Sequence, residues 1–97
     1  MEGMKNDFKD GKLRWDLLDM ESIESVVKIL TMGANKYAPN NFQKVENGRE
    51  RYYAACLRHI VAWRKGEKMD EESSESHLSH AMCNLLFMMW FDREEEI

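Results

Sequence analysis

The sequence predicts an all-α domain, a small antiparallel bundle of three main helices behind an N-terminal lead-in. Apolar residues recur at spacings of three and four over three long segments, which is the pattern of helices with one buried face. No run of five residues alternates cleanly between apolar and polar, so strands have little support. A chain of 97 residues can form one domain, residues 1–97, but not two independent cores.

The first half of the chain predicts a lead-in, a helix and a loop. Residues 1–12 have few apolar anchors and form the loose lead-in. A helix is expected over residues 21–36, where Ile23, Val26 and Leu30 share one face, with Asp19 as its N-cap. Residues 37–48 contain Pro39, three asparagines and a glycine, so they form the principal loop.

The second half predicts two further helices. The first, residues 49–65, ends at Gly66 in a left-handed cap. Its core stripe is Tyr53, Leu57, Ile60 and Val61. The next helix starts at Ser73 or Ser74 and runs to about residue 91, and residues 92–97 are expected to fray because carboxylates gather at the negative end of the helix dipole.

Charge and cysteine content exclude several classes of protein. The net charge of −4 argues against binding a nucleic-acid polymer. Residues 49–65 nevertheless carry five basic side chains against one acidic, and residues 67–75 the reverse. Cys56 and Cys83 lack disulfide or metal-site spacing and are expected to be reduced core residues. The sequence has no apolar run of membrane length and a polar N-terminus, so neither a membrane span nor a signal peptide is expected. A cytoplasmic location is expected instead.

A polar stripe marks the third helix. At 100° per residue, His77, His80 and Asn84 fall within about 60° of one another. They form either one wall of a ligand pocket or a hydrogen bond between helices that fixes their register, because a buried amide must find partners.

The second helix carries candidate phosphate ligands. Arg51 and Arg58 lie seven residues apart beside small alanines that leave room for a ligand, and guanidinium groups match phosphate oxygens. His59 lies on an adjoining face with Trp63. The alternative is that the arginines are ordinary surface residues and the alanines allow close helix packing.

The segment around the principal loop offers candidate contacts for a nucleobase. Aromatic faces stack on bases and asparagine pairs with adenine edges, although turns also use asparagine for backbone reasons. The candidates are Lys36, Tyr37, Asn40, Asn41 and Phe42.

The end of the third helix suggests a homo-oligomer. Met88, Met89, Trp90 and Phe91 are apolar on all sides of the helix. Such a surface is expected to be buried against a partner subunit as well as within the chain.

Four segments in order resemble the phage-associated dATP/dGTP diphosphohydrolase (N-terminal domain) family, which lies within or near the all-α, MazG-like nucleoside triphosphate pyrophosphohydrolases. They are DGKLRWDLL (10–18), GANKYAPNNFQ (33–43), RERYYAACLRHIVAWRKGE (49–67) and DEESSESHLSHAMCNLLFMMW (70–90). The resemblance implies an antiparallel helical assembly that encloses a purine nucleotide between helices of neighbouring subunits.

The resemblance also implies a metal site that this sequence alters. MazG-like enzymes hold Mg²⁺ with an E-E-x-x-E helix and an E-x-x-D helix. His77 and His80 stand nearest to the second motif here, and the facing helix presents Arg58 and His59. Imidazole and guanidinium are poor Mg²⁺ ligands.

Two hypotheses follow. In the first, which the sequence favours, Arg51, Arg58, His59, His77 and His80 grip the phosphates of a purine nucleotide without metal, so that the protein captures it, as a sponge for a host-defence signal would. In the second, the protein cleaves dATP or dGTP to monophosphate and pyrophosphate with Mg²⁺ or Mn²⁺. His77 and His80 then bind metal or act as acid and base, and Glu67 or Asp70 completes the site.

Overall fold

The computed structural model describes residues 11–95 and confirms the all-α prediction. There are three α-helices, α1 (Met20–Lys36), α2 (Gly48–Arg64) and α3 (His77–Glu95). Two short 3-10 helices accompany them: η1 (Trp15–Leu17) precedes α1, and η2 (Asn41–Lys44) lies between α1 and α2. Within this range the β-structure is limited to one isolated bridge between Met69 and Ser76. Most of the expected lead-in lies in residues 1–10, outside the described residues.

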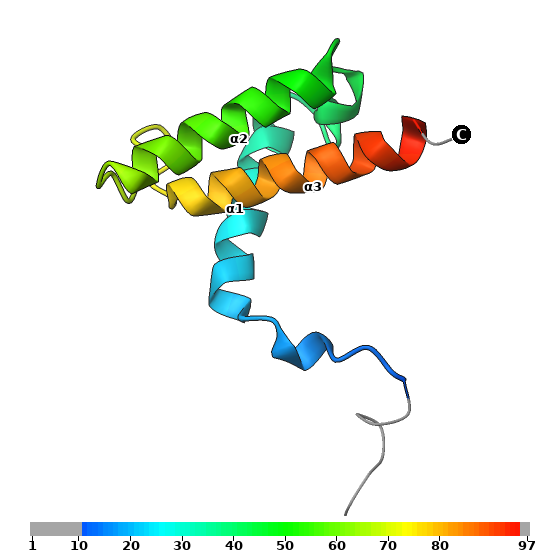
Figure 1. The fold of residues 1–97 in the computed structure, drawn as a ribbon, viewed down its shortest axis with the longest axis horizontal. Coiled ribbons are helices and arrows are strands. Elements are labelled where there is room, and N and C mark those ends of the chain that lie inside the picture. The colour runs from blue at the N-terminus through cyan, green and yellow to red at the C-terminus, as the bar shows by residue number, and fades with distance from the viewer. Residues whose placement is uncertain (1–10, 96–97) are drawn as a thin grey trace, which may run out of the picture.

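The helices form a hairpin and a crossing arm. α2 and α3 run antiparallel and side by side, while α1 passes behind them at a steep angle and its N-terminal half projects away from the pair (Figure 1). Contacts of α1 with α3 and with the connection between α2 and α3 include Ser25 and Val26 and extend to Lys36.

Two helix ends are confirmed and have clear physical causes. Asp19 Oδ1 accepts a hydrogen bond from Glu21 N at 3.2 Å and so caps α1. Gly66 has φ +106°, the left-handed conformation that ends α2 and that glycine adopts without strain.

The predicted limits of the third helix are wrong at both ends. It begins at His77 because Ser74 has φ +61° and Ser73 N donates to Asp70 Oδ2, which makes residues 70–74 a turn. It continues to Glu95 rather than ending near residue 91. Arg49 of α2 pairs with Asp92 and with Glu95, both at 2.8 Å, and these contacts offset the unfavourable dipole that predicted fraying from residue 92.

The predicted loop, residues 37–48, also differs in detail. It contains η2, and α2 starts at its last residue, Gly48. Gly48 is buried, and a Cβ there would lie 2.5 Å from Cζ of Phe91. Glycine at this position allows the start of α2 to approach α3.

The core of one chain is narrow. Val26, Cys56, Ala81 and Cys83 are its buried apolar residues among those described. The predicted core stripe of the second helix is wrong for a single chain, since Tyr53 is 53% exposed and Leu57 44%. The apolar stripes left uncovered fit the expected homo-oligomer, which remains a prediction.

The cysteines are free, buried thiols, as predicted. The Cys83 thiol donates to the Val26 carbonyl at 3.6 Å, and burial raises the pKa of Cys83 to about 11. None of the helices in residues 11–95 is long and apolar enough to cross a membrane.

Candidate functional site

Three histidines meet where the α2–α3 hairpin joins its connection, residues 65–76. His59 comes from α2, and His77 and His80 come from the first turn of α3. The Nδ1 atoms of His59 and His77 lie 2.9 Å apart. The rings of His59 and His80 stack with centroids 4.6 Å apart and planes within 10°. The antiparallel pairing of the two helices therefore gathers imidazoles that are up to 21 residues apart in sequence.

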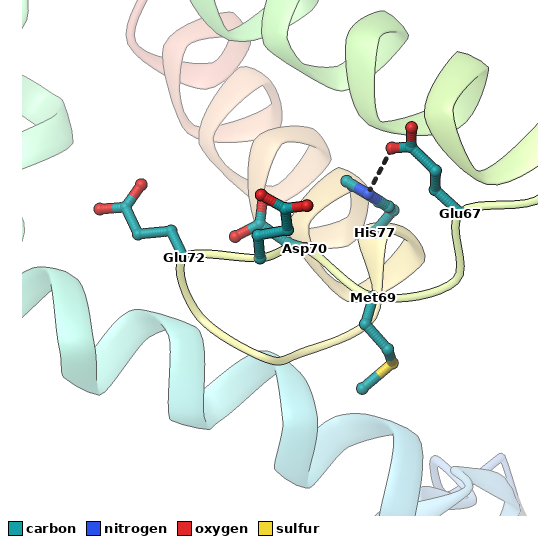
Figure 2. A pocket seen from close by; sticks show the side chains of 6 residues that line it. Glu67, Met69, Asp70, Glu72 and His77 are labelled. Carbon is teal, nitrogen blue, oxygen red and sulfur yellow. Dashed lines mark ion pairs between the residues drawn. The ribbon is translucent and has the colours of Figure 1, made fainter.

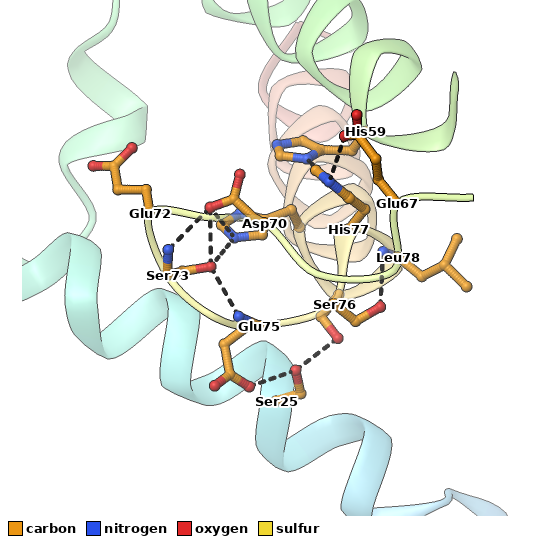
Figure 3. A network of polar contacts seen from close by, with 12 residues as sticks. Ser25, His59, Glu67, Asp70, Glu72, Ser73, Glu75, Ser76, His77 and Leu78 are labelled. Atoms are coloured by element: carbon orange, nitrogen blue, oxygen red, sulfur yellow. Dashed lines mark hydrogen bonds and ion pairs between the residues drawn. The ribbon is translucent and has the colours of Figure 1, made fainter. Parts of the chain in front are cut away.

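The connection adds a carboxylate held by a serine (Figure 3). Ser73 binds Asp70 Oδ2 through its backbone N at 3.0 Å and its hydroxyl at 3.1 Å. The same hydroxyl lies 2.7 Å from His80 Nε2. When the hydroxyl proton goes to Asp70, His80 Nε2 must donate to Ser73, so the chain from Asp70 through Ser73 fixes the orientation and tautomer of His80.

The surroundings of the cluster lower the pKa of two of its imidazoles, His59 and His80. Burial, reinforced by the neighbouring His80 and His77, lowers the pKa of His59. Burial likewise lowers the pKa of His80, against the opposing charge of Asp70. Burial of the Asp70 carboxyl acts to raise its pKa, but the hydrogen bonds from Ser73 and the charge of His80 hold it below the ordinary value. These shifts favour the ionised form of Asp70 and the neutral forms of His59 and His80.

A hollow of about 520 Å³ opens beside the cluster, and we name it the acidic hollow. Figure 2 shows Glu67, Asp70, Glu72 and His77 around it, with Glu67 Oε2 3.6 Å from His77 Nε2. Its lining is Glu67, Met69, Asp70, Glu71, Glu72 and His77. The carboxylates make it a place for a cation rather than for a bare anion.

Two further hollows lie along α1. The lysine hollow, about 530 Å³, includes Lys36, Ser73 and His80. The aromatic hollow, about 400 Å³, includes Tyr37, Phe42, Tyr52 and Phe87. Ile29 and Gly33 line both hollows, so the two are neighbours on one face of α1.

The predicted loop residues line these hollows. Lys36 lines the lysine hollow, where its Nζ pairs with Glu72 at 3.3 Å. Tyr37, 64% exposed, lines the aromatic hollow. Asn40 and Asn41 line it too.

Phe42 has a structural role beside its place in the aromatic hollow. Its ring stacks on Phe87 with centroids 4.2 Å apart, and it meets Trp90 and Phe91 edge to face. One face of Phe42 is thus already used for packing.

Asn84 lies between the two hollows in the order of α3, after His80 and before Phe87. It is only 7% exposed, and no side-chain hydrogen bond within residues 11–95 involves its amide. Because no fully buried side-chain nitrogen or oxygen atom in this range lacks a partner, the amide keeps some contact with solvent. The predicted hydrogen bond between helices is not formed within one chain.

The structure does not bring the predicted arginines to the histidines. Arg51, Arg58 and Trp63 are exposed on α2 and line none of the three hollows. Arg58 precedes His59, so the helix turns it about 100° away from the imidazole cluster. Within one chain, the expected pocket of arginines and histidines is not assembled.

Several residues at the site were missed from the sequence. Ser73 organises Asp70 and His80, and the signal for it is a serine three residues after an aspartate, a common turn pattern. Ser25 of α1 donates to Glu75 and contacts Ser79, which ties the connection to the crossing helix (Figure 3). No local sequence signal identifies such a contact between distant segments.

The carboxylates do not form the Mg²⁺ site that the family resemblance implies. They lie on the connection rather than on two facing helices. Glu75 accepts from Ser25 and Glu72 pairs with Lys36. The helix faces that meet at the site carry imidazoles, and Mg²⁺ prefers oxygen ligands.

Comparison with known proteins defines the relationship. The family model described as dATP/dGTP diphosphohydrolase, N-terminal, matches residues 2–97. The chain belongs to this family. It is similar to the dATP/dGTP diphosphohydrolase of Salmonella phage PMBT28, with 33% identity over 90 residues. The match covers 93% of this chain but only 30% of the length of the phage protein. No solved structure matches the chain.

Proposed function

We propose that this chain binds a purine deoxynucleoside triphosphate, carried with its divalent cation, and hydrolyses it to monophosphate and pyrophosphate. The family and the phage relative support this reaction. The match covers a minor part of the relative's length, so the activity of the isolated domain is part of the proposal.

The charge beside the histidines is the observation that favours hydrolysis over capture. Capture requires cationic groups around bare phosphates, yet Arg51 and Arg58 line none of the three hollows, although, besides burial, the charge of Arg58 helps to lower the pKa of His59. The acidic hollow presents Glu67, Asp70 and Glu71 instead. A bare triphosphate is repelled by such a lining, whereas a triphosphate that carries its cation is attracted.

The two hollows along α1 suit the two ends of such a nucleotide. The aromatic hollow offers the Tyr37 ring for stacking and Asn41 for the edge of a base. The lysine hollow is lined by Lys36 and His80 together with the carboxylates of Asp70 and Glu72, which suits phosphates that carry their divalent cation. The nucleotide then lies along α1 with its phosphates towards the acidic residues of the connection.

In the proposed reaction, a water oxygen bonds to the α-phosphorus and the bond from that phosphorus to the bridging oxygen of the β-phosphate breaks. Pyrophosphate leaves with the bridging oxygen. His80 lines the lysine hollow, and burial lowers its pKa, which favours the neutral imidazole. In the proposed reaction it accepts the proton that the water loses. Asp70, through Ser73, holds the imidazole in place.

The test is incubation of the purified chain with dATP, dGTP, dCTP and dTTP in Mg²⁺ or Mn²⁺, with products separated by anion-exchange chromatography. We expect monophosphate and pyrophosphate from the purine substrates, and a loss of about 100-fold or more in kcat for His80→Ala, which removes the general base. Arg58→Ala is the control. It removes an exposed charged side chain on α2, next to His59 in sequence, and should leave kcat unchanged.

The same experiment distinguishes capture. A nucleotide that stays bound and intact, with binding weakened by Arg58→Ala and unaffected by EDTA, would contradict hydrolysis and support sequestration. Intact and unbound substrate would contradict both functions.

A further inference from the structure

Two imidazoles and a carboxylate converge from three separate segments of the chain. His59 lies on α2, Asp70 on the connection and His77 at the start of α3, and one ligand atom of each lies within 4.8 Å of the others. His77 is only 7% exposed. His59 and Asp70 are half-buried, so the fold rather than chance contact on the surface brings these groups together.

The separation of the two imidazoles fits coordination to one ion. Two nitrogen ligands with bonds of about 2.1 Å lie about 3.4 Å apart on a tetrahedral ion and about 3.0 Å apart on an octahedral one. The Nδ1 atoms of His59 and His77 are 2.9 Å apart. Without an ion, one of these nitrogens donates a hydrogen bond to the other. With an ion between them, both nitrogens point their lone pairs at it instead.

Asp70 has one oxygen to give. Its partners within residues 11–95 all meet Oδ2: Ser73 N and the Ser73 hydroxyl bind it, and His80 Nε2 lies 3.6 Å from it. Oδ1 receives no hydrogen bond from this part of the chain. A carboxylate held by one oxygen and open at the other is arranged as a monodentate ligand.

The outer contacts are those of a metal-bound histidine. In most such sites the second ring nitrogen faces a carboxylate or a carbonyl, which fixes the tautomer. Here Glu67 Oε2 lies 3.6 Å from His77 Nε2 (Figures 2 and 3). His80 has a different place, because its Nε2 is hydrogen-bonded to Ser73 and its ring stacks on His59.

We infer that His59, Asp70 and His77 bind one divalent first-row transition-metal ion, with His80 and Glu67 as supporting groups rather than ligands. Two nitrogen donors and one oxygen donor favour an ion such as Zn²⁺, Co²⁺ or Fe²⁺ over Mg²⁺. This site differs from the sequence-based expectation, which paired His77 with His80. It does not depend on the nucleotide or its turnover.

The experiment uses Co²⁺ alone, without nucleotide. The chain is freed of metal with EDTA, dialysed and titrated with CoCl₂, while the visible ligand-field absorption of bound Co²⁺ is recorded. We expect saturation at one ion per chain and no displacement by excess Mg²⁺. His59→Ala and Asp70→Asn should each weaken Co²⁺ binding by about 100-fold or more, above the upper range for loss of a supporting contact.

Two matched variants control for residue type. His80→Gln removes a supporting imidazole and should keep one bound ion with an affinity weakened by less than about 100-fold. Glu24→Gln removes an exposed carboxylate on α1 and should leave the affinity unchanged. Circular dichroism checks that each variant is folded. His77→Ala should also weaken Co²⁺ binding, but His77 is buried and this variant can fail to fold. In that case His59→Ala and Asp70→Asn decide the result.

Absence of Co²⁺ binding to the folded wild-type chain would overturn the inference. So would binding that His59→Ala and Asp70→Asn leave unchanged. Because no nucleotide is present, these results do not bear on the proposed hydrolysis, which stands or falls on its own products.

Discussion

Replacing Phe42 by alanine separates structural packing from ligand binding in the aromatic hollow. From the sequence, Phe42 and Tyr37 are equivalent candidates for stacking on a base. The structure distinguishes them. Phe42 stacks on Phe87 and meets Trp90 and Phe91 edge to face, whereas Tyr37 is 64% exposed.

The expected size of the effect follows from these contacts. A Phe→Ala substitution in a core lowers the free energy of unfolding by about 3–5 kcal/mol. Phe42 is only partly buried, so we expect the low end, about 3 kcal/mol. For a domain of this size that corresponds to a fall in Tm of roughly 12–24 °C.

The assay is urea and thermal unfolding followed by circular dichroism at equal protein concentrations, since association would make Tm depend on concentration. Tyr37→Ala is the control and should change the free energy of unfolding by no more than about 0.5 kcal/mol, while weakening nucleotide binding. Equal stability of the two variants would refute the assignment of Phe42 to the packed cluster.

Three further outcomes are expected. Gly33→Ala should stabilise the chain by about 0.5–1 kcal/mol because its Cβ meets nothing within 4 Å, whereas Gly48→Ala should destabilise it by about 1–2 kcal/mol because the Phe91 ring must move; urea unfolding measures both. The Cys83 thiol, with a pKa raised to about 11 by burial, should react with Ellman's reagent at pH 8 only after unfolding, and prompt reaction of the native chain would contradict its burial. The hydrogen bond from Ser22 lowers the pKa of Asp19, so the stability that Asp19→Ala removes should be present at neutral pH and lost as pH falls through that lowered pKa; a difference that persists below it would count against the cap.

The helices could be predicted from sequence because apolar spacing reports a helical period directly. The same spacing does not say what covers an apolar face, which is why Tyr53 and Leu57 were assigned to a core and are exposed in one chain. The start of α3 was placed too early because the turn at Ser74 depends on the contact of Ser73 with Asp70. That contact belongs to the folded connection rather than to a local propensity.

The site was predicted in part for the same reason. His77 and His80 share a face of one helix, and sequence spacing shows this. Their meeting with His59 depends on how α2 pairs with α3, and that register is set by the length and shape of the connection. Arg51 and Arg58 share a helix face by their spacing of seven residues, but the sequence does not show that this face lies outside the hollows, while His59 on the adjoining face meets α3.

In the proposed reaction, water attacks the α-phosphorus of a purine deoxynucleoside triphosphate at this histidine and carboxylate site. The most direct measurement is hydrolysis of dGTP in ¹⁸O-labelled water, followed by mass spectrometry of both products. Attack at the α-phosphorus places one labelled oxygen in the monophosphate and none in pyrophosphate. Label in the pyrophosphate, release of inorganic phosphate, or triphosphate that stays intact would contradict it.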